Sequence, residues 1–242
     1  MKTRIFSFGV LLVLVALLLG CGSNGGGLTR AEKALITGSD SLMRVLTVRD
    51  SSDLAVLRAE SVDFSAADLA SPEFEALVAK MKYTVQDPSQ DGVGIAAPQV
   101  GLNRRLIVVC RMDLPGEPFV AYANVQIDSL WGETLVGREG CLSIPGLRGN
   151  VARAGFAAVS YVDLGALAVS GAASGDASGI VSARASSVSA GASSEGATSS
   201  SALPVRREVV SGYVARIFQH EVDHLSGILY TDRTGEVWEV EE

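Results

Sequence analysis

Apolar residues recur every three or four positions in two stretches of the chain, and this spacing predicts two helices. The first begins at Ser71 and Pro72, because serine suits a helix N-cap and proline suits the first helical residue. It is predicted to run to about residue 85, and its apolar residues share one face: Phe74, Leu77, Val78 and Met81. The second predicted helix lies within residues 212–230 and ends near Gly227.

Shorter stretches rich in β-branched and aromatic residues predict strands. Residues 105–110 are a β-branched run suited to a buried strand, and residues 119–128 and 157–164 are further candidates. The closing residues 235–242 alternate enough for a short strand, while residues 44–64 are predicted as an extended arm. Strands and helices do not alternate as βαβ units, so the pattern favours an α+β fold.

The first 20 residues have the pattern of a signal peptide. Lys2 and Arg4 precede an apolar run over residues 5–19, which is short for a membrane span. The cysteine that follows, Cys21, resembles the acylated cysteine of bacterial lipoproteins, although Leu19 stands where a smaller residue is usual. A cleaved secretory signal or an uncleaved short anchor is the alternative. Residues 21–41 would then be a flexible tether, glycine-rich at first, to a domain over residues 42–242.

A Ser/Ala/Gly-rich stretch interrupts this domain at about residues 166–204. It has a few scattered charges and no apolar periodicity, so it lacks the apolar surface that would offset its ordering entropy. We expect a disordered insert within one domain, because the motifs on its two sides contribute to one site.

The net charge of −7 and pI near 5.0 argue against a nucleic-acid partner bound by a basic surface. The three cysteines lie too far apart to indicate a disulfide framework.

The only two histidines of the chain lie four residues apart, in a His-Glu-x-x-His sequence. On a helix, His220 and His224 share one face and can bind the same metal ion, with Glu221 beside it to transfer protons. A catalytic metal site has three protein ligands and an open position. Cys141, in the turn-forming sequence GREGCLSIPG, is one candidate for the third ligand, whereas Cys110 ends an apolar strand and is expected to be a buried thiol. A HExxH protease would instead use a downstream carboxylate: Asp232, Glu236 or Glu239.

A glycine-rich stretch at residues 91–101 resembles a dinucleotide-binding fingerprint but lacks its context. No strand precedes it, and Pro98 stands in the helix that should follow. It is better interpreted as a loop whose backbone approaches a ligand closely, with the Gln99 amide directed at that ligand.

Three motifs together, GVGIAAPQ, EGCLS and QHEVDHLSG, resemble in order the three motifs of the peptide deformylases. The resemblance runs from about residue 44 to residue 233 and skips the insert. It implies antiparallel sheets around a central helix that carries the two histidines. It also implies an enzyme that removes the N-formyl group from formyl-methionyl peptides and releases formate.

The resemblance also implies a role for each site residue. Cys141, His220 and His224 would bind one divalent metal ion, usually Fe2+, with Zn2+, Ni2+ or Co2+ able to replace it. Glu221 would act as general base and then as proton donor. Gln99 and the backbone N–H of Leu142 would stabilise the oxyanion. Glu139 is expected to pair with Arg153. The substrate would contact the glycine-rich loop and one face of the metal-binding helix: Gly92, Val93, Gly94, Ile95, Tyr213 and Ile217.

Two features depart from a cytosolic enzyme that acts on nascent chains. The signal sequence predicts a membrane-anchored lipoprotein outside the cytoplasm, unless translation starts at Met43, which would give a cytoplasmic protein. The C-terminal residues 235–242 are acidic and too short to bind a ribosome, so the expected partner is a formylated peptide or the N-terminus of a nascent chain, without ribosome binding. A catalytically silent lipoprotein that only binds peptides remains the alternative from another functional class.

Overall fold

The computed structural model describes residues 26–38, 40–90, 92–167 and 202–240. The predicted signal peptide, Cys21 and most of the predicted insert lie outside these residues. Within them, no helix has both the length and the apolar character needed to cross a membrane.

Helices dominate the N-terminal third of the described chain, and two antiparallel sheets follow. The first four helices are α1 (Arg30–Gly38), α2 (Ser51–Leu57), α3 (Ala66–Leu69) and α4 (Pro72–Gln86). The first sheet has the order β1-β2-β3: Gly94–Ala96, Leu106–Cys110 and Phe119–Ala123. The second sheet has the order β4-β5-β6, with β7 paired to β5: Gln126–Cys141, Ile144–Val162, Val205–Ser211 and Val237–Glu239. The remaining elements are helix α6 (Gly212–Leu225) and the 3-10 turns η1 (Ala97–Val100) and η2 (Tyr230–Arg233).

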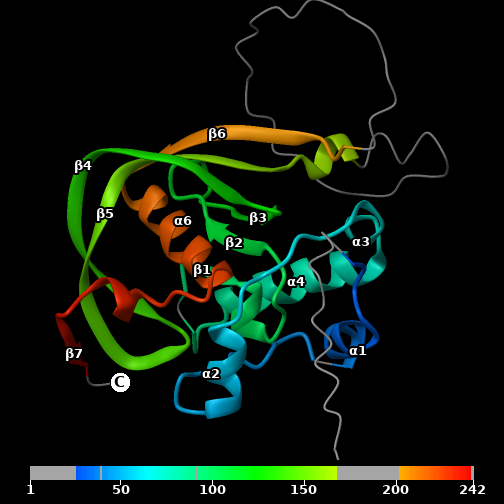
Figure 1. Cartoon of the computed structure of the whole chain (residues 1–242), viewed down its shortest axis with the longest axis horizontal. Helices are drawn as coiled ribbons and strands as arrows, with labels where there is room; N and C mark the ends of the chain where they lie inside the picture. The colour runs from blue at the N-terminus through cyan, green and yellow to red at the C-terminus, as the bar shows by residue number, and fades with distance from the viewer. Residues whose placement is uncertain (1–25, 39, 91, 168–201, 241–242) are drawn as a thin grey trace, which may run out of the picture.

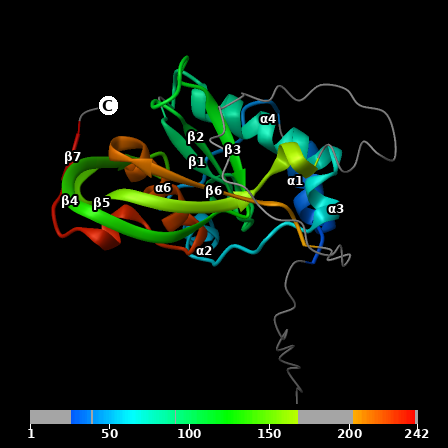
Figure 2. The ribbon, with the colours of Figure 1, turned by 90° about the horizontal axis from the view of Figure 1, so that it is seen from above.

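Helix α6 lies at the centre of the molecule. It packs against the long β4–β5 hairpin on one side and against β1 and β2 on the other (Figure 1). Helices α1, α3 and α4 gather at the opposite end from the outer part of the hairpin (Figure 2). Most side chains of α6 are buried, including those of its charged residues. The α+β fold with antiparallel sheets around a central helix is therefore confirmed.

Two main hydrophobic clusters hold these layers together. One joins α1, α3 and α4 to the first sheet and includes Phe64, Leu77, Met81 and Ile95. The other joins α6 to the inner faces of both sheets and includes Tyr122 and Phe218, whose rings meet edge to face. The expected strand at 105–110 is the buried strand β2, and Cys110 ends it as a buried free thiol, as predicted.

Two elements differ from the sequence prediction. The arm at residues 44–64 contains helix α2, because the Asp50 carboxylate caps it by accepting from the backbone N–H groups of Ser52 and Asp53. Seven residues are too few to show helical periodicity in the sequence. The single strand expected at 119–128 is two strands in different sheets, since Asn124 breaks it with a φ of 50°. The Asn124 side chain then bonds both backbone groups of Phe64.

The tether predicted over residues 21–41 is wrong for its second half. Residues 30–38 form α1, and Leu28 and Ile36 are buried in the first hydrophobic cluster. The Arg104 guanidinium binds the Glu32 carboxylate through two nitrogens, at 2.6 and 2.9 Å, and also the carbonyls of Gly26 and Gly27. Because α1 buries few side chains, its composition resembles that of a tether. The few side chains that it does bury attach it to the domain.

Candidate metal centre

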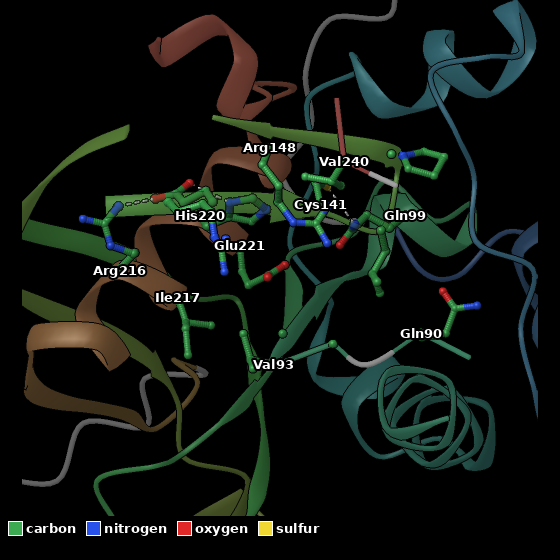
Figure 3. A pocket seen from close by; sticks show the side chains of 18 of the residues that line it. Gln90, Val93, Gln99, Cys141, Arg148, Arg216, Ile217, His220, Glu221 and Val240 are labelled. Atoms are coloured by element: carbon green, nitrogen blue, oxygen red, sulfur yellow. Dashed lines mark hydrogen bonds and ion pairs between the residues drawn. The ribbon is translucent and has the colours of Figure 1, made fainter. Parts of the chain in front are cut away.

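A cavity of about 740 Å³ opens between α6, the β4–β5 turn and the glycine-rich loop before β1. Figure 3 shows the side chains that line it, which come from segments far apart in the sequence. Two of them, Cys141 and His220, together with His224 behind them on α6, offer metal ligand atoms that lie within 4.8 Å of one another. In the part of the chain that the structure describes, this is the only such cluster of His, Cys, Asp or Glu.

The fold positions these three ligands in two ways. His220 and His224 are one turn apart on α6, with their rings 5.1 Å apart. Cys141 is the last residue of β4, and the two-residue turn Leu142–Ser143 connects it to β5. Its Sγ lies 3.3 Å from Nε2 of His224, a separation that suits two ligands of one tetrahedral ion. One thiolate and two imidazoles therefore fit a borderline-soft divalent metal ion.

The carboxylate of Glu139 fixes the ring of His220. Its Oε2 lies 2.9 Å from Nδ1 of His220, which leaves Nε2 to face the metal position. Arg153 binds both carboxylate oxygens at 3.0 Å, so the predicted Glu139–Arg153 pair is confirmed. Burial alone would raise the pKa of Glu139, but its bonds to His220 and Arg153 outweigh this and lower the pKa to about 2.

Glu221 is the one carboxylate of the cavity that no cation binds. It is buried, and its Oε2 has no hydrogen-bond partner among the described residues. Burial raises the pKa of Glu221 to about 7, which suits a group that must accept and return a proton near neutral pH. A Cβ atom on Gly94 would stand 2.5 Å from Oε1 of Glu221, so this close approach requires glycine.

Gln99 reaches the site from the 3-10 turn that follows β1. Its Oε1 accepts the backbone N–H of Ala96 at 2.8 Å, and this bond directs the amide nitrogen inward. The nitrogen lies 3.4 Å from Sγ of Cys141 and 3.2 Å from Oγ of Ser143. The arm before α2 supports the arrangement, because the backbone N–H of Leu46 donates to the Gln99 carbonyl.

Most of the residues predicted to contact substrate line the cavity. Gly92, Val93, Gly94, Tyr213 and Ile217 all do, and Tyr213 lies at its mouth with 54% of its surface exposed. The catalytic candidates Gln99, Leu142 and Glu221 line it as well.

Ile95 is the exception, because it does not line the cavity. Its side chain is fully buried in the first hydrophobic cluster. Side chains alternate along a strand, so Ile95 points away from the face that Gly94 turns toward Glu221.

The downstream carboxylates that a HExxH protease would use are occupied elsewhere. Asp232 pairs with Arg58, and a Glu236 oxygen accepts from the Asn150 amide at 3.2 Å. Glu239 is exposed on β7. The interpretation with a carboxylate as third ligand is therefore wrong, and Cys141 completes the cluster.

Two charged residues of α6 shape the site although no sequence motif assigned them a role there, Arg216 and Asp223. Arg216 donates to Glu139 at 2.8 Å and to the Val151 carbonyl at 2.9 Å. Asp223 accepts from Arg153 at 2.6 Å and pairs with Arg233. Arg216 lies one residue before Ile217 and four before His220. This spacing places Arg216 one helical turn from His220, and it is the signal in the sequence that indicates a position near the site.

Comparisons with known proteins agree with this geometry. A model of the polypeptide deformylase family matches residues 43–182 and 205–238. A peptide deformylase of Leptospira biflexa is 30% identical over 192 residues, which cover 74% of this chain and 82% of that protein. The structure of a class I type b peptide deformylase of Acinetobacter baumannii with actinonin bound is 29% identical. It matches with a TM-score of 0.57 and covers 80% of this chain and 99% of that chain. The chain therefore belongs to the peptide deformylase family, whose members remove the N-formyl group from formyl-methionyl peptides.

Proposed function

We propose that this chain deformylates short formyl-methionyl peptides outside the cytoplasm, with Fe2+ bound by Cys141, His220 and His224. One observation carries the catalytic part of the proposal. Three convergent metal ligands lie beside Glu221, a buried carboxylate with no cation partner in the described part of the chain, at the base of a peptide-sized cavity. The Acinetobacter baumannii enzyme has also been solved with Met-Ala-Ser bound, which supports the assignment of this cavity to a peptide.

The residues of the chain suggest how the reaction proceeds. Cys141, His220 and His224 would hold a divalent ion, which would supply Lewis-acid activation of water and of the formyl carbonyl when bound. Glu221 takes the proton from the attacking water and delivers it to the leaving amine. The Gln99 amide and the backbone N–H of Leu142 donate to the oxygen on which negative charge develops. Glu221 is buried against Gly94, and burial raises its pKa to about 7, so the carboxylate can both take and return the proton.

The choice of Fe2+ rests on the family and on the donor set. A thiolate with two imidazoles accepts Fe2+, Zn2+, Ni2+ and Co2+, so the ligands alone do not select iron. Metal analysis of protein purified without oxygen tests this part of the proposal. Iron near one atom per chain is the expected result, and zinc at that level would contradict it.

The location outside the cytoplasm rests on residues 1–21, which carry a signal pattern and a candidate acylated cysteine. The proposed partners are accordingly a membrane, bound through a lipid on Cys21, and a released formylated peptide. Nucleic acid and the ribosome are not among the proposed partners. Fatty-acid labelling of the full chain beside Cys21→Ser tests the anchor, and equal labelling of the two chains would contradict it.

Formate release tests the activity most directly. The full chain in detergent, loaded with Fe2+ without oxygen, is given formyl-Met-Ala-Ser beside a Glu221→Gln variant. We expect one metal ion per chain in both proteins and a rate about 10²- to 10⁴-fold lower in the variant, which is the usual effect of removing a general acid–base group. A folded, metal-loaded wild type that releases no formate would favour the alternative of a silent peptide-binding lipoprotein.

A further inference from the structure

Two arginines line the cavity without a carboxylate partner among the described residues. Among the described ion pairs, none involves Arg138 or Arg148, and both residues line the cavity. Of the other charged residues in the lining, Arg216 and Glu139 bind each other, and Glu221 is the buried proton-transfer group. The side-chain charge of the lining that has no partner is therefore positive, although the whole chain has a net charge of −7.

The position of Arg148 is determined by a glycine. A Cβ atom on Gly140 would stand 2.6 Å from both Cδ and Nε of Arg148, so the arginine side chain lies directly on the backbone of Gly140. Gly140 immediately precedes the metal ligand Cys141. One guanidinium nitrogen of Arg148 donates to the Leu147 carbonyl at 2.8 Å, and the side chain extends toward Cys141 and Gln99 (Figure 3).

The strand register places Arg138 beside Arg148. Arg138 of β4 pairs with Asn150 of β5, two residues from Arg148. Such diagonal neighbours on antiparallel strands are about 7–8 Å apart, within reach of long side chains. The one acidic residue of β7, Glu239, lies opposite Leu147, and no described ion pair joins it to either arginine.

We propose that Arg138 and Arg148 form a carboxylate-binding subsite that selects formylated peptides with a free C-terminus a few residues after the methionine. This subsite rests on the deformylase function proposed above. A peptide whose formyl group is at the metal extends about 3.3–3.6 Å per residue toward the mouth. There its terminal carboxylate meets two guanidinium groups, which bind carboxylates with matched geometry. A nascent chain carries no terminal carboxylate at this distance, so the subsite favours released peptides.

Two substrates that differ only in this charge test the subsite. We compare kcat/KM for formyl-Met-Ala-Ser as the free acid and as its C-terminal amide, using the full metal-loaded chain. The free acid should be preferred about three- to tenfold, as expected for partly exposed ion pairs. In a variant with both Arg138→Gln and Arg148→Gln, the ratio should fall to about one. Added salt should lower the ratio for the wild type.

Because the two kcat/KM values are compared within each protein, a general loss of activity in a variant does not change their ratio. Arg207→Gln is the matched control, because it removes one positive charge from an exposed side chain of β6 that does not line the cavity. This control should keep the wild-type ratio. Equal kcat/KM values for the two peptides in the wild type, or a ratio that survives in the double variant, would overturn the subsite while leaving the deformylase function intact. Release of formate from neither peptide would overturn the function as well.

Discussion

Two buried clusters of arginine and carboxylate in this protein have opposite charges at their centres. In the N-terminal cluster, an arginine, Arg104, is central and is surrounded by Glu32 and three backbone carbonyls. In the cluster under α6, a carboxylate, Glu139, is central and is surrounded by His220 and two arginines. The first cluster attaches a terminal helix, and the second orients a metal ligand.

The two clusters differ in how many hydrogen-bond partners remain for the arginines when a carboxylate is removed. Arg104 keeps its carbonyl acceptors if Glu32 is removed, so part of its hydrogen bonding survives. Arg153 and Arg216 have no second carboxylate that could replace Glu139 for both of them, since only Arg153 also contacts Asp223. Removing a carboxylate should therefore destabilise the protein more in the cluster under α6, and only a change in this cluster should weaken metal binding.

The largest effect is expected when the N-terminal segment is removed altogether. A chain that starts at Met43 lacks the buried Leu28 and Ile36, and it leaves Arg104 without Glu32 and without the carbonyls of Gly26 and Gly27. Each lost apolar side chain costs about 1.5–3 kcal/mol, and breaking a buried ion pair costs about 3–5 kcal/mol. The sum approaches the whole stability of a typical domain, which is about 5–15 kcal/mol. Urea unfolding should show a large fall relative to a chain that starts at Gly26, and equal midpoints would show that α1 is dispensable.

Glu139→Gln should have the next largest effect and should act on both stability and metal binding. The amide keeps the shape of the side chain but leaves Arg216 without a carboxylate and Arg153 with Asp223 alone, at a cost of about 3–5 kcal/mol. Loss of the carboxylate behind His220 should weaken metal affinity about 10- to 100-fold. Urea unfolding and metal titration against a competing chelator measure the two effects. Unchanged metal affinity in a folded variant would refute the orienting role of Glu139.

Glu32→Gln should destabilise the protein less, by about 1–3 kcal/mol, because Arg104 retains its backbone acceptors. Its metal affinity and its rate of formate release should equal those of the wild type, since neither Glu32 nor Arg104 lines the cavity. This variant is thus the matched control for Glu139→Gln. A clear fall in metal affinity would mean that the two clusters are coupled.

The smallest effect on stability is expected from a fall in pH. Burial would raise the pKa of Glu32, but its hydrogen bonds, above all that from Arg104, lower the pKa from 4.5 to about 2. The unfolded chain therefore binds this proton at a higher pH than the folded chain does. The stabilisation by Glu32 is fully present above about pH 4.5 and is lost as the pH falls toward 2. The difference in urea midpoint between wild type and Glu32→Gln should shrink between pH 5 and pH 3, and a constant difference would contradict this pKa.

Sequence patterns predicted the elements with strong local signals. Helix α4 follows its Ser71 cap and proline, and α6 follows the apolar period that also carries the two histidines. The patterns failed where the signal was short or depended on distant contacts. Helix α2 rests on one capping aspartate, and the break at Asn124 depends on bonds to Phe64, 60 residues away in the chain.

The site shows the same division. The sequence by itself determined the chemistry, because the two histidines, Glu221, Gln99 and Cys141 lie in motifs whose spacing is set by one helix turn, one strand end and one loop. Only the tertiary structure decided between Cys141 and a downstream carboxylate, turned Ile95 away from the cavity and placed Arg216 under Glu139. The physical reason is that local spacing fixes which face of an element a side chain occupies. Contacts between residues some 80 positions apart, such as Glu139 with His220, exist only after the sheets close around α6.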